Sequence, residues 1–461
     1  MTESAVSPIA LIALVLAAIL IFLLPRKYAV IPILVIFFLV PLNQQIVIGP
    51  IHLFFYRILI LVGMFRMLGA SIGSDPNRLP GGFNSIDRAF FWCTICQALA
   101  AIFVLGIDAW INQAGFLWDN LGGYFLLRLL IKDDEDIQRT TKCLVLITLV
   151  LAVCMIVEAR TLHNVFVYLG GNPAPDMRDG RVRCQGSFAH ALMAGAFGST
   201  LLCLFLTLWK TGKSHALALT GIVGAAAVTW TSNSSTSLLS FAAGVLGLCL
   251  WPIRKSMRAV RWGIVLGLIA LQLVMKAPIW FAIAHIDLTG SSSGYHRAAL
   301  IDTFIRHFFD WWLIGIKDTS VWGWDMWDAQ NEFVNVGDTG GLIALVLFIA
   351  MISRCFAKLG DARREAEVEK GDEWTLWLLG CALFSNIVAF FGVNYFDQTK
   401  FAWFALLAMI SAATAPLLHA SPVTSSELDF PRRGSPFTYS TPPLSNPLVR
   451  KFGSKISEGT K

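Results

Sequence analysis

Charged residues are scarce in this sequence: only 14% of its 461 residues are Asp, Glu, Lys or Arg, while 56% are hydrophobic. A soluble protein of this length needs more charge on its surface, so a soluble globular fold is excluded. Apolar runs of about 20 residues, the length that crosses a bilayer as a helix, recur along the whole chain. The first is Ile9–Leu24 and the last is Phe401–Leu418. We therefore predict an all-α polytopic membrane protein with about twelve or thirteen transmembrane helices.

Several common sequence signals are missing. The opening residues 1–4 lack the basic residues that begin a cleavable signal peptide, so the first apolar run is predicted to remain as a permanent span. The nine cysteines are scattered. The pair Cys93 and Cys96 lies inside an apolar run, where packing is expected rather than a zinc or disulfide site. The eight histidines show no metal-ligand spacing, so no metal and no cofactor are predicted.

Basic residues are concentrated in short loops between alternate apolar runs. The clusters at 26–27, 254–261 and 354–364 are expected to face the cytoplasm under the positive-inside rule. These loops account for most of the net charge of +6 without a nucleic-acid partner. With thirteen spans, the N-terminus falls outside and the C-terminus inside.

The same reading divides the chain into a membrane domain and a tail. Residues 1–420 are predicted to form one polytopic domain with two large outer loops, at about 158–187 and 285–338. The segment 421–461 is rich in Pro, Ser and basic residues and lacks apolar periodicity. It is predicted to be a disordered cytoplasmic tail.

The first outer loop contains cationic residues where the positive-inside rule expects few. Arg181 and Arg183 lie two residues apart, just before the start of the next span. Guanidinium groups bind phosphate oxygens bidentately, and a helix N-terminus adds free N–H groups, so this arrangement suits a diphosphate. The alternative is that the arginines pair with Asp176, Asp179 and Glu158, or bind lipid headgroups.

The second outer loop combines helical periodicity with many tryptophans. Arg297, Leu300, Ile301, Phe304 and Phe308 follow helical spacing. Aromatic side chains of this density are typical of an amphipathic helix in the membrane interface, where they anchor at headgroup level. The tryptophans concerned are Trp311, Trp312, Trp322, Trp324 and Trp327.

Two carboxylates end this second loop. Asp328 and Glu332 are four residues apart, so on a helix they would share one face. A carboxylate beside a site at the membrane surface is suited to act as a general base. The alternative is that these groups cap a helix or pair with a loop cation.

Five short motifs follow one another along the two loops and their flanking spans. They are an Arg before a Gly-x-Phe entry into a span (181–188), a Ser-rich turn (232–237), a Gly-x-x-Arg loop start (294–297), a Trp-x-x-Gly midsection (312–315) and an Asn followed by Gly-Leu (331–342). Over roughly residues 116–350 this ordered set resembles the O-antigen ligase and O-antigen polymerase superfamily of bacterial membrane glycosyltransferases.

The resemblance implies a GT-C-like, metal-independent glycosyltransferase in the inner membrane of a bacterium. Its donor would be an oligosaccharide linked to a polyprenyl diphosphate, and its acceptor a glycan of O-antigen or exopolysaccharide synthesis. Membrane lipids and other polysaccharide-assembly proteins would be further partners. Arg181, Arg183 and Arg297 would bind the diphosphate and stabilise the negative charge that builds on it as it leaves.

The resemblance also suggests the residues that act on the acceptor. Asp328 or Glu332 would be the general base, Asn331 would orient the acceptor or the base, and Arg297 would complete the catalytic set. In this superfamily a His precedes the Asn, and Gln330 stands in that position here. This departure favours a polymerase over a ligase that transfers glycan to lipid A core.

Two other classes of protein remain as alternatives. A transporter of lipid-linked glycans would keep ionisable residues at mid-membrane depth. Such residues are few, Arg57 and Arg128 being the clearest, and each is expected to pair or to snorkel to the interface. The third alternative is a non-catalytic scaffold of a polysaccharide-export complex.

Overall fold

The computed structural model describes residues 6–49, 51–69, 79–178, 180–211, 214–285, 294–369, 372–396 and 398–419. The chain divides into two units, Met1–Ala420 and Ser421–Lys461, and the described residues all belong to the first. The predicted disordered tail therefore lies outside the described residues.

Helices make up about 78% of the structure, which confirms the all-α prediction. Strand is limited, among the described residues, to the hairpins β1 (Gln45–Ile48) with β2 (Ile51–Phe54) and β3 (Asp176–Arg178) with β4 (Arg181–Arg183). The helices are α1 (Pro8–Leu23), α2 (Val30–Leu39), α3 (Phe55–Gly69), α4 (Ser85–Leu105), α5 (Trp110–Leu117), α6 (Gly123–Leu130), α7 (Asp134–Thr161), α8 (Ala191–Leu206), α9 (His215–Thr231), α10 (Ser235–Cys249), α11 (Met257–Val274), α12 (Gly294–Arg306), α13 (Phe308–Trp311), α14 (Glu332–Glu369), α15 (Glu373–Phe390) and α16 (Thr399–His419).

The lengths of these helices fit a multi-pass membrane protein. Among the described residues, seven helical segments are long and apolar enough to cross a membrane, and they comprise α4, α7, α8, α11, α14, α15 and α16. Helices α1, α9 and α10 are apolar but shorter. The predicted twelve or thirteen crossings would require the shorter helices to cross as well, so that number stays a prediction.

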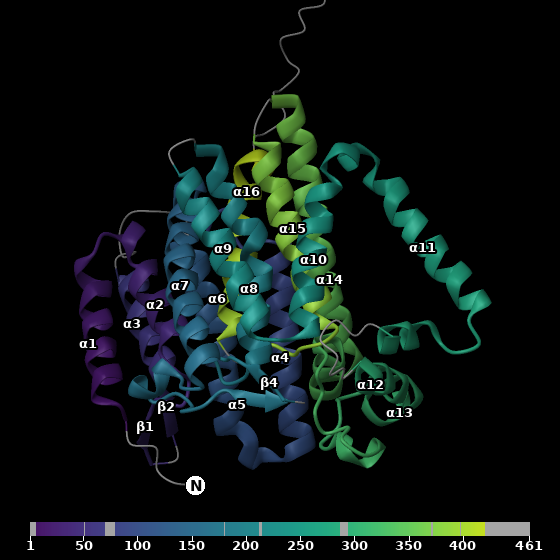
Figure 1. Ribbon diagram of the computed structural model, residues 1–461, viewed down its shortest axis with the longest axis horizontal. Helices are drawn as coiled ribbons and strands as arrows, with labels where there is room; N and C mark the ends of the chain where they lie inside the picture. Colours follow the sequence, from purple (N-terminus) through teal and green to yellow (C-terminus); the bar gives the residue numbers. More distant parts are fainter. Residues whose placement is uncertain are drawn as a thin grey trace, which may run out of the picture. The chain divides into compact units, whose positions relative to one another are not determined.

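Helix α11 differs from its neighbours in its surroundings. It stands apart from the other helices in Figure 1, and none of its residues is buried. Its exposed side chains are largely apolar and include Trp262, Ile264 and Leu268. A helix that is apolar on all sides and contacts little protein is stable where lipid surrounds it, as expected of a membrane span.

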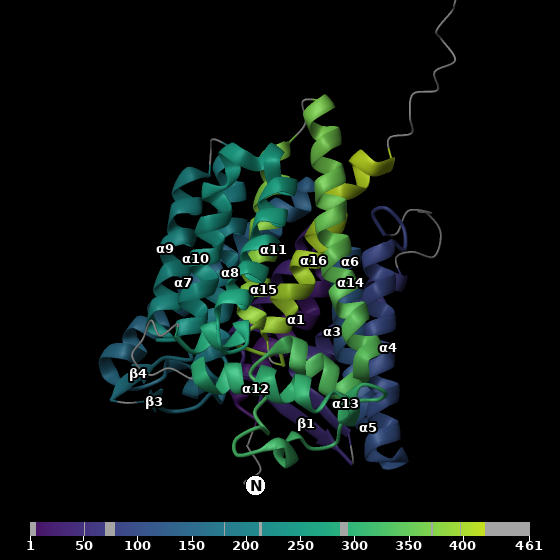
Figure 2. The same ribbon diagram turned by 90° about the vertical axis from the view of Figure 1, so that its right-hand side faces the viewer.

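Both predicted outer loops contribute to the same end of the helix bundle. Figures 1 and 2 show β3, β4, α12 and α13 gathered at the end drawn at the bottom, together with β1, β2 and α5. We call it the Arg297 end, after a buried arginine of α12. Helices α14 and α15 are joined at the opposite end, where Glu373 pairs with Arg254 (3.0 Å) and Arg363 (2.6 Å). That the Arg297 end faces outward stays a prediction of the positive-inside rule.

The second outer segment has a small apolar core of its own. Leu300 and Phe304 of α12 pack with Trp311 and Trp322, and the rings of Phe304 and Trp311 stack with centroids 4.0 Å apart. The expected single helix is interrupted, because α12 ends at Arg306 and α13 begins at Phe308. The five tryptophans thus divide into two groups. Trp311 and Trp322 are buried in this core, whereas Trp312, Trp324 and Trp327 are exposed.

Helix α14 is broken near its start, at the glycine of the Gly-Leu pair that ends the last sequence motif. Gly341 has a φ of +72°, a conformation that favours glycine, and the helix begins nine residues earlier than the expected Gly-Leu entry. The backbone groups freed by the break bond to the loop after α13: Leu342 N–H donates to Trp312 O (2.7 Å), and Ile316 N–H donates to Asp338 O (2.6 Å). Two of the five motifs are thereby in contact.

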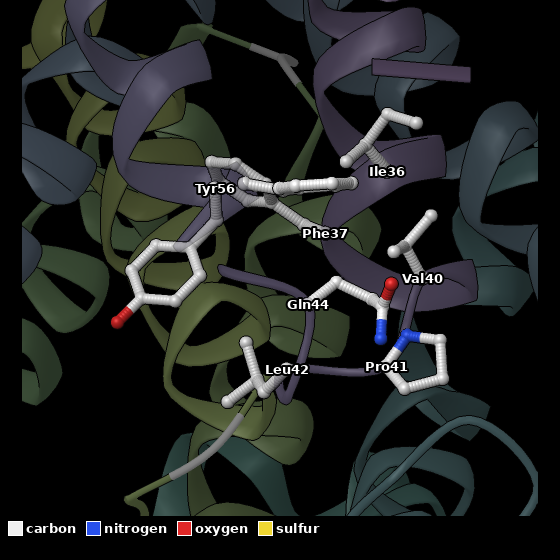
Figure 3. A pocket seen from close by; sticks show the side chains of 8 residues that line it. Ile36, Phe37, Val40, Pro41, Leu42, Gln44 and Tyr56 are labelled. Atoms are coloured by element: carbon white, nitrogen blue, oxygen red, sulfur yellow. The ribbon is translucent and has the colours of Figure 1, made fainter. Parts of the chain in front are cut away.

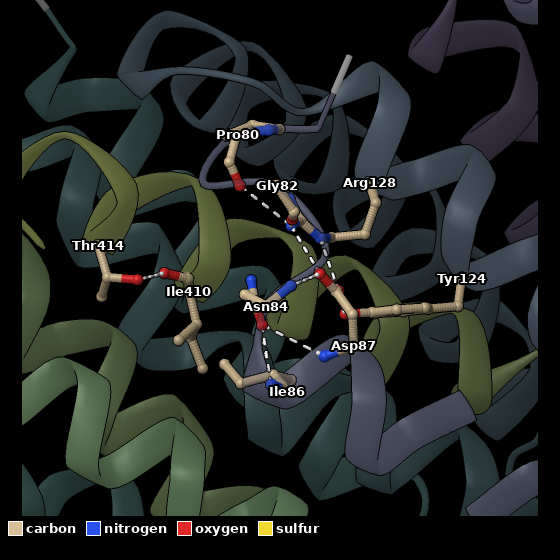
Figure 4. Close-up of polar contacts among 9 residues, drawn as sticks. All are labelled: Pro80, Gly82, Asn84, Ile86, Asp87, Tyr124, Arg128, Ile410 and Thr414. Atoms are coloured by element: carbon tan, nitrogen blue, oxygen red, sulfur yellow. Dashed lines mark hydrogen bonds and ion pairs between the residues drawn. The ribbon is translucent and has the colours of Figure 1, made fainter. Parts of the chain in front are cut away.

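Helix α4 begins with a capping box whose carboxylate has a second function (Figure 4). Asn84 Oδ1 accepts from the backbone N–H of Asp87, and Asp87 Oδ2 accepts from the backbone N–H of Asn84. The same carboxylate accepts two hydrogen bonds of 3.0 Å from Arg128 on α6 and one from the Tyr124 hydroxyl. Asp87 and Arg128 are both 0% exposed, so this ion pair is fully buried.

Removing one partner of this pair should destabilise the protein strongly. We expect Asp87→Asn to lower the free energy of unfolding by about 3–5 kcal/mol, because it leaves the Arg128 charge buried without a counter-charge. The measurement is the thermal unfolding midpoint of the full chain in detergent. Asp361→Asn, which breaks an exposed pair with Arg364, is the matched control and should change little. A midpoint unchanged by Asp87→Asn would show that the pair is not structural.

Candidate functional site

The hairpin β3–β4 places the first outer loop beside the turn between α9 and α10. Its strands pair Arg178 with Arg181 and Asp176 with Arg183, so all four side chains lie on one face of the hairpin. Directly after β4, the backbone N–H of Cys184 donates to Thr231 O (3.1 Å) at the end of α9. This bond fixes β4 next to the Ser-rich turn.

Glu158 anchors the chain where it returns from this hairpin to the bundle. The carboxylate, at the end of α7, accepts the backbone N–H groups of Gln185 (3.2 Å) and Gly186 (2.9 Å). Asn164 adds a bond from Nδ2 to Gly186 O (2.7 Å). The sequence offered Glu158 as a partner of the arginines, whereas its oxygens accept these backbone groups.

The arginines of the hairpin are not equivalent. Arg183 is half-buried and pairs with Asp176 (3.2 Å), as one of the alternatives expected, while Asp179 lies outside the described residues. Burial lowers the pKa of Arg183, the Asp176 charge opposes this, and the neighbouring Arg178 adds to it. Arg181 is exposed at the turn of the hairpin.

Arg297 is the most deeply buried cation of this end among the described residues, with 6% of its surface exposed. Within the described part of the chain, its Nε–H has no hydrogen-bond partner. The pKa of Arg297 is lowered to about 10, first because the side chain is buried and then because Arg178 and Arg183 lie nearby, while Asp328 acts in the opposite direction. The group still bears its charge at neutral pH.

The structure thus gathers Arg178, Arg183 and Arg297 from two segments about 120 residues apart in the sequence. Of the predicted diphosphate-binding residues, Arg183 and Arg297 come together, and Arg178 is the third member of the cluster, while Arg181 lies at the exposed turn. Like charges held together at partly buried positions repel one another, and an anion between them relieves that repulsion.

Asp328 is held beside this cluster by its neighbours in the sequence. Its carboxylate accepts a hydrogen bond from Nε2 of Gln330, and its charge acts on Arg297. Nε2 of His296 lies 3.3 Å from the backbone oxygen of Asp328, which connects α12 to the segment before α14. A carboxylate oriented in this way beside arginines is suited to accept a proton from a bound hydroxyl group.

Asn331 and Glu332 have local structural partners. Asn331 Oδ1 accepts from the backbone N–H groups of Phe333 (2.9 Å) and Val334 (3.2 Å) and so caps α14. Glu332 accepts from the backbone N–H of Tyr395 (2.7 Å). Because α14 begins at Glu332, Asp328 is not on the same helix, and the shared helix face suggested by their spacing is not formed.

A second polar cluster lies on the N-terminal helices. Asp119, on a π-helical turn between α5 and α6, accepts from Arg57 at 2.7 and 2.8 Å and from the Tyr56 hydroxyl at 2.9 Å. Lys400 lies 3.8 Å from the same carboxylate. Tyr56 also borders a small, mostly apolar pocket with Gln44 (Figure 3). Arg57 is thus paired, as Arg128 is, which makes both arginines structural.

Three members of the site were missed in the sequence: Arg178, His296 and Gln330 as the partner of Asp328. Arg178 could have been found from the hairpin, because a turn at Gly180 between an Asp-x-Arg strand and an Arg-x-Arg strand places it opposite Arg181. The contact of His296 with the backbone of Asp328 depends on how α12 meets the segment before α14, which no local pattern reveals. The contact of Gln330 with Asp328 spans only two residues, but its geometry is not fixed by their spacing. Among the described residues there is no group of three His, Cys, Asp or Glu side chains arranged to hold a metal ion.

No family model and no curated protein sequence matches this chain.

The contacts of Asn331 give a prediction that separates capping from chemistry. We expect Asn331→Ala to lower the free energy of unfolding by about 0.5–2 kcal/mol, because two backbone N–H groups of α14 lose their acceptor. Asn331→Asp keeps an acceptor oxygen and should retain both the thermal midpoint and any activity. A stable Asn331→Asp protein without activity would instead show that the amide N–H₂ takes part in the reaction.

Proposed function

We propose that this protein is a metal-independent membrane glycosyltransferase that acts on glycan units linked to a polyprenyl diphosphate, as a polysaccharide polymerase does. One observation supports this above all: a buried Arg297 whose Nε–H lacks a partner in the described structure, with Arg178, Arg183 and Asp328 around it. Such a site is preorganised for an anionic group next to a proton acceptor.

The arginines fit the leaving group of this reaction. As the bond between the anomeric carbon and the diphosphate oxygen breaks, its electron pair stays on the diphosphate, where negative charge builds up. Arg178, Arg183 and Arg297 stabilise that charge from fixed positions, so little reorganisation is needed during the reaction. Guanidinium groups also match phosphate oxygens in geometry.

Asp328 is the proposed general base. Its carboxylate takes the proton of the acceptor hydroxyl while that oxygen bonds to the anomeric carbon, which inverts the configuration there. Gln330 holds the carboxylate through its Nε2–H, so the residue in the superfamily's His position acts here by positioning the base. Glu332 is the weaker candidate because its carboxylate is bound to the backbone of Tyr395.

The proposed location is the periplasmic face of a bacterial inner membrane, in a GT-C-like architecture. This follows from the positive-inside rule and from the resemblance of the loop motifs. Transport is a less suitable function, because Arg57 and Arg128, the clearest ionisable residues within spans, are each bound bidentately by a carboxylate. A ligase that transfers the glycan to lipid A core is the second candidate, since it would use the same donor.

The test is deletion of the gene in its host and complementation with Arg297→Ala or Asp328→Ala. We expect single repeat units to accumulate and long chains to be lost, with transfer reduced at least about 100-fold in either variant. Arg306→Ala is the matched control on the same helix, because Arg306 is exposed and pairs with Asp302 at 2.6 Å. Membrane levels of each variant are compared by immunoblot, and the size distribution of surface polysaccharide is measured on gels.

The outcomes separate the candidates. Long chains that form but stay unattached to lipid A would identify a ligase. Normal chains in both variants at wild-type protein levels would show that the proposed site is wrong.

A further inference from the structure

Two tryptophans beside the proposed base are exposed, although the loop that carries them has an apolar core of its own. Trp324 is 91% exposed, the largest fraction of any large apolar side chain in the described structure, and Trp327 is 69% exposed. Trp322, in contrast, is buried with Phe304 in that core. Two indole rings left in solvent three residues apart form a local apolar surface, and such surfaces commonly mark interaction sites.

The loop that presents these rings has a defined backbone. Figures 1 and 2 show the chain between α13 and α14 extending beyond α12 at the Arg297 end. Thr319 Oγ1 donates to Met326 O (2.8 Å) across the loop, and the buried Trp322 donates from its indole Nε1 to the Asp310 carboxylate (3.3 Å). A loop that is already ordered loses little entropy when a ligand covers it, so the surface is preorganised for binding.

A tight turn separates the two tryptophans. Met326 N–H donates to Gly323 O (3.4 Å), and Asp325, the third residue of this turn, has a φ of +63°. Gly or Asn is usual where a turn needs a positive φ, and other residues are strained there. The side chain of Asp325 is partly exposed. An aspartate at this position therefore places an accessible carboxylate between Trp324 and Trp327 in the sequence, which a glycine would not.

The turn lies next to the proposed general base. Trp327 directly precedes Asp328 in the sequence, and Nε2 of His296 lies 3.3 Å from the backbone oxygen of Asp328. Nδ1 of the same imidazole lies 4.0 Å from the carboxylate of Asp325. His296 thus connects both ends of this short segment to α12. A ligand that covers the turn is therefore close to the proton acceptor of the proposed reaction.

The charges of the segment favour a sugar over the membrane surface as its ligand. Residues 323–330 contain two carboxylates, two tryptophans and one carboxamide, and they contain no Lys or Arg. Segments that lie in the membrane interface combine aromatic side chains with Lys and Arg, which are attracted to anionic lipids. Aromatic rings next to carboxylates instead suit a carbohydrate, whose C–H faces stack on indole rings while its hydroxyl groups donate to acceptor oxygens.

We propose that Trp324 and Trp327 form a platform for the acceptor glycan, on which its sugar rings stack so that the attacking hydroxyl group is directed toward Asp328. Asp325 accepts hydrogen bonds from sugar hydroxyl groups at the turn between the two rings. This platform rests on the proposed function, and it gives the acceptor a binding surface separate from the arginines that bind the donor.

The test measures binding of repeat-unit oligosaccharides to the full chain in lipid nanodiscs by titration calorimetry. The oligosaccharides are released from the surface polysaccharide of the host with mild acid and separated by size. Trp324→Leu and Trp327→Leu keep an apolar side chain but remove the aromatic ring, so each should weaken binding by roughly tenfold. Trp324→Tyr and Trp327→Tyr supply a ring again and should recover most of the affinity.

The matched control is Trp312→Leu. Trp312 is also exposed and belongs to the same outer segment, but it lies outside the turn. Its replacement removes an aromatic ring in the same way and should leave the affinity for the oligosaccharides at the wild-type level. Elution profiles from size-exclusion chromatography show which variants are folded, and should one leucine variant of the turn fail to fold, the other still decides.

Unchanged affinity in Trp324→Leu and Trp327→Leu would overturn the platform, while oligosaccharide binding by the wild type would leave the proposed function intact. If both variants and Trp312→Leu were instead depleted from membranes at unchanged affinity, the tryptophans would be membrane anchors and the platform would fall. No binding of any oligosaccharide by the wild type would also overturn the platform. The proposed function would then be decided by its own test, the loss of long chains on deletion of the gene.

Discussion

A charge buried in a helix bundle has to meet an opposite charge, because the low-dielectric interior leaves an isolated ion several kcal/mol or more above its energy in water. Two arginines of this chain meet an opposite charge through a bidentate ion pair. Asp87 binds Arg128 through two hydrogen bonds, and Asp119 binds Arg57 in the same way. Each pair joins helices that are far apart in the sequence and so fixes how those helices meet.

The Arg297 end departs from this rule. There, Arg178, Arg183 and Arg297 influence one another, while Asp176 pairs with Arg183 and Asp328 is the carboxylate that acts on Arg297. Arg297, the most deeply buried of the three arginines, has no hydrogen-bond partner for its Nε–H among the described residues. A buried guanidinium N–H without a partner costs stability, which is reasonable where a bound anion completes its hydrogen bonds.

The sequence predicted the class of fold and the segments that matter, but not their partners. Apolar runs and basic loops were sufficient for a multi-pass helical protein, because hydrophobic length and charge asymmetry are local properties. Asp87 and Arg128 are 41 residues apart, and nothing in either segment shows that they pair. The same holds for Asp328: its spacing from Glu332 suggested a common helix, whereas Asn331 caps α14 between them and ends that possibility.

The position of Gln330 links this local structure to the chemistry. In the proposed reaction, an imidazole there could exchange a proton itself, whereas a carboxamide cannot, so we assign the proton acceptor to another side chain. The Nε2–H of Gln330 donates to Asp328 and leaves the remaining lone pairs of that carboxylate for another donor. Gln330 directly precedes Asn331, which caps the start of α14. The proposed base, Asp328, therefore lies just before the first turns of α14. The break of α14 at Gly341 bonds to the loop after α13 through Trp312 O, and that loop packs with α12, the helix of Arg297.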